Sequence, residues 1–194
     1  KGAYSLKILE RMYIMNLPNK LTMLRILLIP VFMVVLYWNF PGATWVALAI
    51  FIIASFTDLL DGKIARKYNL VTDFGKFADP LADKMLTTAA FIAMLSCGRM
   101  SAWALMLILL REFIVSGIRL VAVTEGKVIA ASLLGKIKTV SQMVAIIAAI
   151  LMYLFFEQET AKLVSDILIW FSTVATIISG ADYVIKNWKL LELK

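Results

Sequence analysis

The sequence is dominated by six long apolar runs separated by short polar or turn-forming breaks. A membrane-spanning helix needs about 20 predominantly apolar residues to cross a hydrocarbon core about 30 Å thick. Because 62% of the 194 residues are hydrophobic, the chain carries more apolar surface than a water-soluble domain of this length can bury. We therefore expect an all-α integral membrane protein with six transmembrane helices. The runs predict helices at about 20–38, 43–61, 72–97, 101–122, 134–156 and 162–185.

Positive charge is distributed unevenly over the breaks between these runs. The connections expected on the outer side hold Arg99 and, just beyond a turn, Lys162, together with the acidic Glu157 and Glu159. Cytoplasmic loops of membrane proteins are enriched in Lys and Arg, so we expect both termini to face the cytoplasm. This topology and anionic lipid explain the net charge of +7, and no nucleic-acid partner is expected. The basic residues of the cytoplasmic side are Lys20, Lys63, Arg66, Lys67, Lys127, Lys136, Lys138, Lys186, Lys189 and Lys194.

Residues 1–15 precede the first apolar run and do not resemble a signal peptide, since they lack an apolar core and a small-residue cleavage site. Their apolar residues Ile8, Leu9, Met12 and Tyr13 are set against charged Lys7, Glu10 and Arg11, a pattern that predicts a short amphipathic helix at the membrane interface. The other interpretation is an artificial leader ahead of a native start at Met15. Residues 16–194 are expected to form the six-helix membrane domain.

Histidine is absent and Cys97 is the only cysteine, which excludes several kinds of active site. A single cysteine cannot form an internal disulfide. A Cys/His zinc site and a Ser-His or Cys-His mechanism are excluded as well, because each needs histidine or several cysteines.

Four aspartates lie where two apolar runs meet the cytoplasmic side. Residues three or four apart share a helix face, so Asp58 and Asp61 project together from the second run, as do Asp79 and Asp83 from the third. A tight connection between the two helices would bring both pairs into one cluster. Carboxylates crowded at membrane depth repel one another unless cations neutralise them. We therefore predict two divalent cations, Mg²⁺ or Mn²⁺, which prefer oxygen ligands and can clamp both oxygens of a phosphoryl displacement.

Small residues accompany the aspartates at Gly62, Ala65 and Gly75. They remove side-chain bulk where a nucleotide or its pyrophosphate must approach the backbone. The alternative interpretation is a hydrated interfacial face, in which the aspartates simply lie beside neighbouring lysines and arginines.

The start of the third helix decides the role of Asp79. A start near Thr72 places Gly75, Asp79 and Asp83 on one stripe and leaves Pro80 inside the helix, where it should cause a bend. The alternative start has Asp79 as N-cap and Pro80 as the first helical residue, which would make Asp79 a capping residue instead of a ligand.

The stretch from Asp58 to Asp83 resembles the signature of the CDP-alcohol phosphatidyltransferases, D-x2-D-G-x2-A-R-x8-G-x3-D-x3-D, at every fixed position and spacing. The resemblance implies a six-helix membrane fold, usually a homodimer, with an active site open to the cytoplasm. It implies a sequential in-line displacement, in which an acceptor hydroxyl attacks the lipid-linked phosphorus of CDP-diacylglycerol and CMP departs. The implied metal ligands are Asp58, Asp61, Asp79 and Asp83, with Asp83 also the general base, and the implied CDP-binding residues are Gly62, Ala65, Arg66 and Gly75.

Charged residues also lie within the other apolar runs. Arg25, one turn from Thr22, is expected to contact the CDP phosphates or the aspartate cluster, and we assign both residues to CDP-lipid binding. Intramembrane charges mark a substrate site or pair with one another, and Arg and Lys suit a phosphate dianion. We therefore expect the acceptor alcohol to carry a phosphate. Its expected ligands are Arg111, Arg119, Lys136 and Lys138.

Two of these basic residues have an alternative role. Arg111 would instead form an ion pair with Glu112 or another acidic neighbour. Lys138 would instead be a topology residue whose amine reaches the membrane surface.

The segments Asn16–Arg25, Arg111–Arg119 and Gly135–Thr139 resemble bacterial members of the same family whose acceptor is sn-glycerol 3-phosphate. The resemblance implies phosphatidylglycerol phosphate as product and a multi-pass protein of the bacterial cell membrane. Other acceptors in the family are inositol phosphate, serine and phosphatidylglycerol. Two interpretations from other classes are a divalent-cation or phosphate transporter and a noncatalytic membrane scaffold. A transporter would need charges on both sides of the bilayer midplane, whereas here they cluster at the cytoplasmic ends.

Overall fold

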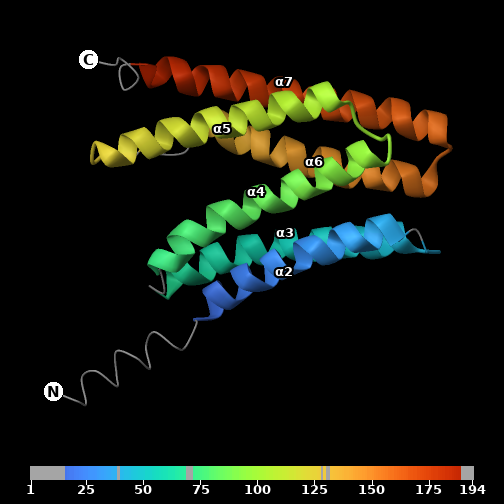
Figure 1. Cartoon of the computed structure of the whole chain (residues 1–194), viewed down its shortest axis with the longest axis horizontal. Helices are drawn as coiled ribbons and strands as arrows, with labels where there is room; N and C mark the ends of the chain where they lie inside the picture. The colour runs from blue at the N-terminus through green and yellow to red at the C-terminus, as the bar shows by residue number, and fades with distance from the viewer. Residues whose placement is uncertain (1–15, 39, 69–71, 128, 130–131, 189–194) are drawn as a thin grey trace, which may run out of the picture. The chain divides into compact units, whose positions relative to one another are not determined.

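The computed structural model describes residues 16–38, 40–68, 72–127, 129 and 132–188, with the backbone alone at 59, 61–63, 65–67, 73–74, 76–77 and 79–80. This part of the chain is all-α (Figure 1). It forms two compact units, Lys1–Ala89 and Ala90–Lys194. The six helices are α2 (Leu17–Trp38), α3 (Ala43–Lys67), α4 (Asp73–Ser96), α5 (Ala102–Thr124), α6 (Leu133–Phe155) and α7 (Gln158–Lys186). Helix α4 therefore runs from the first unit into the second.

All six predicted helices are present, but two of their starts differ from the prediction. Helix α2 begins at Leu17 and not near residue 20, because Asn16 caps it: the Asn19 amide donates to Asn16 Oδ1 at 3.1 Å. Helix α7 begins at Gln158 and not at 162. Its first turn is polar, so hydropathy alone does not locate this end of the helix. The first 15 residues, with both interpretations given to them, lie outside the described residues.

Helices α3 and α4 carry the two halves of the signature. The bounds of α4 decide between the two predicted starts of this helix. Helix α3 continues to Lys67, well past the predicted end at 61, because one glycine costs a helix only about 1 kcal/mol and the residues after Gly62 favour helix. Helix α4 begins at Asp73, which places Asp79 in its interior. The alternative in which Asp79 caps the helix is therefore wrong.

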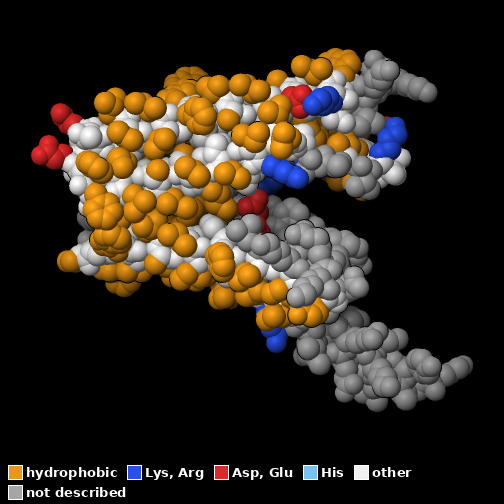
Figure 2. All heavy atoms as spheres, turned by 180° about the vertical axis from the view of Figure 1, so that it is seen from behind, with side chains coloured by type: hydrophobic (Ala, Val, Ile, Leu, Met, Phe, Trp, Pro, Cys, Tyr) orange, Lys and Arg blue, Asp and Glu red, His pale blue; other side chains and the backbone are white. Residues whose placement is uncertain are grey.

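The outer surfaces of the helices are those of a membrane protein. Helices α2, α6 and α7 are each long and apolar enough to cross a membrane, and α3 is apolar over Ala43–Asp58. Helix α5 carries three charged residues within an otherwise apolar sequence. Large apolar side chains such as Ile53, Phe113 and Phe171 are more than half exposed. Hydrophobic side chains accordingly cover most of the face in Figure 2.

In the first unit, α2 packs along α3 through aromatic and small side chains. The rings of Phe32 and Phe51 are both fully buried, with their centroids 6.0 Å apart. Ala47 and Ala54 lie on the same buried stripe of α3 as Phe51 and are fully buried too. Small side chains of this kind let two membrane helices approach closely.

In the second unit, α7 packs against both α5 and α6 through a buried stripe of small polar residues. The hydroxyls of Ser172, Thr173 and Thr176 donate to carbonyls one turn earlier in α7, so they are satisfied without water. Gln142 of α6 donates from Nε2 to Thr176 Oγ1 at 2.9 Å, which fixes the register of α6 on α7.

Candidate functional site

The predicted signature occupies the carboxyl end of α3 and the amino-terminal half of α4. Asp58 and Asp61 lie three residues apart on α3, and Asp79 and Asp83 lie four apart on α4, so each pair shares one helix face as predicted. The side chains of Asp58 and Asp83 are both partly exposed. The side chains of five other predicted site residues lie outside the described part: Asp61, Gly62, Ala65, Arg66 and Asp79.

An ion pair between α2 and α3 holds the first aspartate of the signature. Arg25 Nη1 lies 2.6 Å from Asp58 Oδ1, and the Arg25 side chain is fully buried whereas that of Asp58 is 29% exposed. Contact with the aspartate cluster was one of the two roles predicted for Arg25. The guanidinium lies against the Asp58 carboxylate and fixes its orientation. The residue one turn earlier, Thr22, is also fully buried and donates to the Pro18 carbonyl at 3.1 Å.

A second link within the first unit joins the start of α4 to the start of α2. Thr72 Oγ1 accepts from the Gly75 amide and donates to Asn19 Oδ1, both at 3.0 Å. Thr72 is therefore the N-cap of α4, and Gly75, whose amide it accepts from, is buried. From the sequence, Thr72 was predicted only as the start of this helix. A threonine followed directly by an aspartate, here Thr72 and Asp73, is the sequence pattern that indicates a helix N-cap.

Two of the four predicted acceptor ligands converge on one buried carboxylate in the second unit. Arg111 Nη1 lies 3.0 Å from Glu112 Oε1, and Lys138 Nζ of α6 forms a short ion pair with the same oxygen. The side chains of Arg111 and Lys138 are 9% and 10% exposed. The ion pair predicted as the alternative role of Arg111 is thus present. Lys138 is buried and pairs with Glu112 of α5. Among the described side chains, two cations and one carboxylate meet in this cluster.

Helix α7 completes this cluster at a position that the sequence analysis missed. Arg111 Nη2 donates to Ser179 Oγ at 2.8 Å. The next residue, Gly180, leaves the space in which the Arg111 side chain runs, since a Cβ there would lie 2.6 Å from Arg111 Cγ. A Ser-Gly pair in an apolar helix signals close packing, but it does not indicate which residue packs there.

The other two predicted acceptor ligands are exposed. Arg119 Nε donates to the Tyr183 hydroxyl at 3.3 Å, and its guanidinium carbon lies 5.6 Å from the centre of the Tyr183 ring. Lys136 follows the N-cap Ser132 in the first turn of α6, with an exposed side chain. Both cations are therefore accessible to a soluble anion, unlike Arg111 and Lys138.

The donors that the structure describes suit a divalent cation. Asp58 and Asp83 supply carboxylate oxygens, which are the ligands that Mg²⁺ and Mn²⁺ prefer. Among the side chains that are described, no group of three or more acidic, Cys or His residues lies together. Since the chain has no histidine and one cysteine, carboxylates are its principal metal-ligand type.

Comparison with known proteins gives one matching family model and several similar sequences. Residues 15–178 match the family model described as CDP-alcohol phosphatidyltransferase. A CDP-diacylglycerol–glycerol-3-phosphate 3-phosphatidyltransferase of Bacillus subtilis is 44% identical over 189 residues, covering 91% of this chain and 97% of that protein. A Rickettsia bellii protein of the same name is 42% identical, covering 87% and 93%. A probable phosphatidylglycerophosphate synthase of Mycobacterium tuberculosis is 40% identical, covering 92% and 84%.

Proposed function

The chain belongs to the CDP-alcohol phosphatidyltransferase family, and on that premise we propose that it transfers the phosphatidyl group of CDP-diacylglycerol to sn-glycerol 3-phosphate. The products are phosphatidylglycerol phosphate and CMP. The observation that carries the proposal is the complete aspartate signature at the end of α3 and the start of α4, in a chain similar over nearly its full length to enzymes named for this reaction.

The proposed chemistry is one in-line displacement, and Asp83 is its general base. Asp83 takes the proton of the acceptor hydroxyl as that oxygen forms a bond to the lipid-linked phosphorus. The bond from this phosphorus to the CMP oxygen breaks in the same step. Arg25 orients Asp58, since its buried guanidinium lies 2.6 Å from the Asp58 carboxylate. No covalent intermediate is needed.

Members of this family generally depend on divalent metal. We propose two ions, Mg²⁺ or Mn²⁺, held by Asp58, Asp61, Asp79 and Asp83. Bound there, they supply neutralising charge for the phosphates of the CDP group. Gly62, Ala65, Arg66 and Gly75, with Thr22 and Arg25, form the proposed CDP-lipid site.

The acceptor phosphate is assigned to the basic residues of α5 and α6. Arg119 and Lys136 are the proposed direct ligands, because their charged groups are exposed and engage no described carboxylate. Arg111 and Lys138 complete the proposed set, where their two cations meet the carboxylate of Glu112. Such a cluster favours a dianionic acceptor over serine or phosphatidylglycerol.

We also propose the location, topology and assembly of the enzyme. We place it as a multi-pass protein in the bacterial cell membrane, with six spans, both termini and the active site on the cytoplasmic side, and a homodimer as its assembly. The uneven distribution of Lys and Arg supports the orientation.

The test is CMP release by purified protein in detergent, with CDP-diacylglycerol and Mg²⁺. We expect release with glycerol 3-phosphate, little with inositol phosphate, serine or phosphatidylglycerol, and none after chelation of the metal. Release with a different alcohol would overturn the acceptor and leave the chemistry standing. Ion flux without CMP release would favour a transporter instead.

Carboxylate variants separate an enzyme from a scaffold. Asp61→Asn and Asp79→Asn are each expected to reduce activity by at least about 10³-fold, since each removes one metal ligand. Asp166→Asn on α7 is the matched control, because it also removes one carboxylate but lies outside the signature. Equal activity in all three would contradict the proposed metal site.

A further inference from the structure

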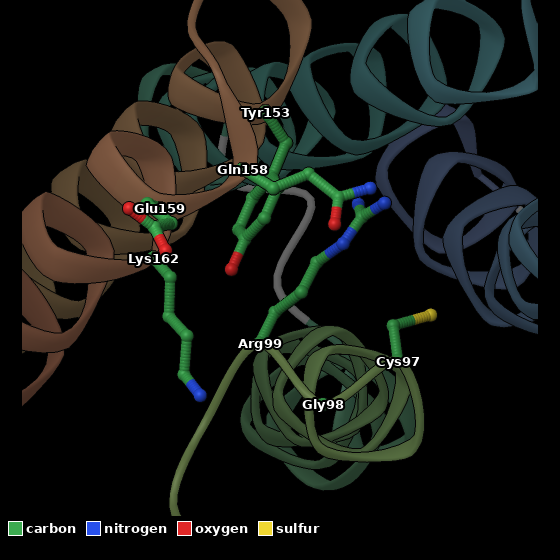
Figure 3. A pocket seen from close by; sticks show the side chains of 7 residues that line it. All are labelled: Cys97, Gly98, Arg99, Tyr153, Gln158, Glu159 and Lys162. Atoms are coloured by element: carbon green, nitrogen blue, oxygen red, sulfur yellow. The ribbon is translucent and has the colours of Figure 1, made fainter.

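A polar pocket lies in the second unit, at the opposite end of α4 from the aspartates. It has a volume of about 360 Å³ and lies between the α4–α5 and α6–α7 connections (Figure 3). Its lining residues are Cys97, Gly98, Arg99, Tyr153, Gln158, Glu159 and Lys162. None of them has a role in the transfer reaction, so the pocket needs a separate explanation.

Two cations line this pocket without a carboxylate partner among the residues that the structure describes. The guanidinium carbon of Arg99 lies 4.3 Å from the centre of the Tyr153 ring, and this stacking holds the half-buried side chain in place. Neither Arg99 nor Lys162 forms an ion pair with any described residue. Five other basic residues do contact a carboxylate: Arg25, Arg111, Lys127, Lys138 and Lys186.

The arrangement of the side chains leaves the two cations available to an anion. Glu159 is three residues before Lys162 on α7, a spacing at which a helix can form an ion pair. In Figure 3, however, the Lys162 ammonium points away from the Glu159 carboxylate, and Arg99 extends toward Tyr153 and Gln158. The lining has two positive charges and one negative charge, together with the amide of Gln158.

The surroundings of the pocket identify the anion as one carried by lipid. Helices α6 and α7 are both apolar enough to span a membrane, so the turn between them lies at the level of the headgroups. Phe155 and Phe156 follow the lining residue Tyr153 closely in the sequence, and Leu163 follows Lys162. The three side chains are 64%, 53% and 64% exposed, so apolar surface for acyl chains adjoins the lining residues along the chain. Basic pockets between membrane helices bind phosphate-bearing headgroups, and an arginine fork suits phosphate.

We propose that this pocket binds the phosphate of an anionic phospholipid, with Arg99 and Lys162 as its ligands. The site is distinct from the substrate sites, and its failure would leave the proposed reaction untouched. Tyr153 holds Arg99 in position, and Glu159 limits the affinity by repelling the phosphate.

The test compares thermal unfolding of the purified chain in micelles that contain phosphatidylglycerol or phosphatidylcholine. We expect phosphatidylglycerol to raise Tm by about 3 °C or more over phosphatidylcholine, the shift produced by a ligand at roughly tenfold excess over its Kd. Arg99→Gln/Lys162→Gln should lose this increment. Lys127→Gln, which removes an exposed lysine elsewhere, should keep it. An equal increment in the double variant would overturn the proposal.

Two further measurements test the site even if the double variant folds poorly. Glu159→Gln should enlarge the increment, because it removes the only acidic side chain of the lining. Cys97 lines the pocket and is exposed, so bound lipid should slow its alkylation several-fold in phosphatidylglycerol relative to phosphatidylcholine. An unchanged increment in Glu159→Gln with no slowing at Cys97 would overturn the site. The same Tm increment from millimolar inorganic phosphate alone would overturn the assignment to lipid.

Discussion

Arg111 depends on the absence of a side chain at Gly180. Its guanidinium contacts both Glu112 and Ser179, so the side chain cannot easily move aside from an added methyl group. Gly180→Ala places a Cβ 2.6 Å from Arg111 Cγ. We expect a loss of about 2 kcal/mol, seen as a fall in Tm of about 6 °C, with reduced activity.

A matched glycine in α5 serves as the control for this substitution. Gly117 is also helical, and a Cβ there meets nothing within 4 Å. Gly117→Ala should therefore stabilise the chain by about 0.5 to 1 kcal/mol, since alanine favours helix over glycine. Similar Tm changes in the two variants would show that Arg111 accommodates the methyl group.

The pair of Arg25 and Asp58 separates stability from activity. Arg25→Gln leaves Asp58 without its guanidinium, and we expect a loss of about 2 kcal/mol, less than for a fully buried pair because Asp58 is 29% exposed. Arg25→Gln/Asp58→Asn removes both charges and should recover part of the Tm. Activity should stay below about 1% of that of the unaltered chain in both variants, since the single variant loses the group that orients a proposed metal ligand and the double variant also loses that ligand. A double variant less stable than the single one would contradict this account.

At the scale of a helix, the start of α4 depends on one hydroxyl. Thr72→Ala removes both the cap of α4 and the bond to Asn19 of α2. We expect a loss of about 1 kcal/mol, measured as Tm in detergent, and a fall in CMP release because the cap positions the helix that carries Asp79 and Asp83. Thr72→Ser keeps the hydroxyl and should restore both values. Loss of both in the serine variant would attribute the effect to the methyl group instead.

The helices and the signature were predictable because both are local in sequence. Apolar runs located all six helices, and spacings of three and four placed each aspartate pair on one face. Helix ends were less predictable: apolarity reports the part of a helix inside the membrane, whereas α3 continues through Gly62 to Lys67. The Ser179–Gly180 site for Arg111 could not be predicted, because it depends on which face of α7 packs against α5.

At the scale of the whole molecule, the proposed orientation places the single cysteine on the outer side of the membrane. Cys97 lies in the α4–α5 connection and is exposed. In intact bacterial spheroplasts, a membrane-impermeant maleimide should label it to completion without permeabilisation. Completion is the proper measure, because a bound lipid slows the rate of labelling but does not abolish it.

A second position reports the opposite side in the same experiment. Glu125 lies in the exposed turn after α5, which the positive-inside rule places in the cytoplasm. In a Cys97→Ser background, Glu125→Cys should be labelled only after the membrane is permeabilised. Labelling of both positions from outside would mean a leaky preparation, which a cytoplasmic marker protein detects. The reverse pattern would place the aspartate signature outside the cell, where CDP-linked substrates are not made, and would overturn the proposed orientation together with the proposed reaction.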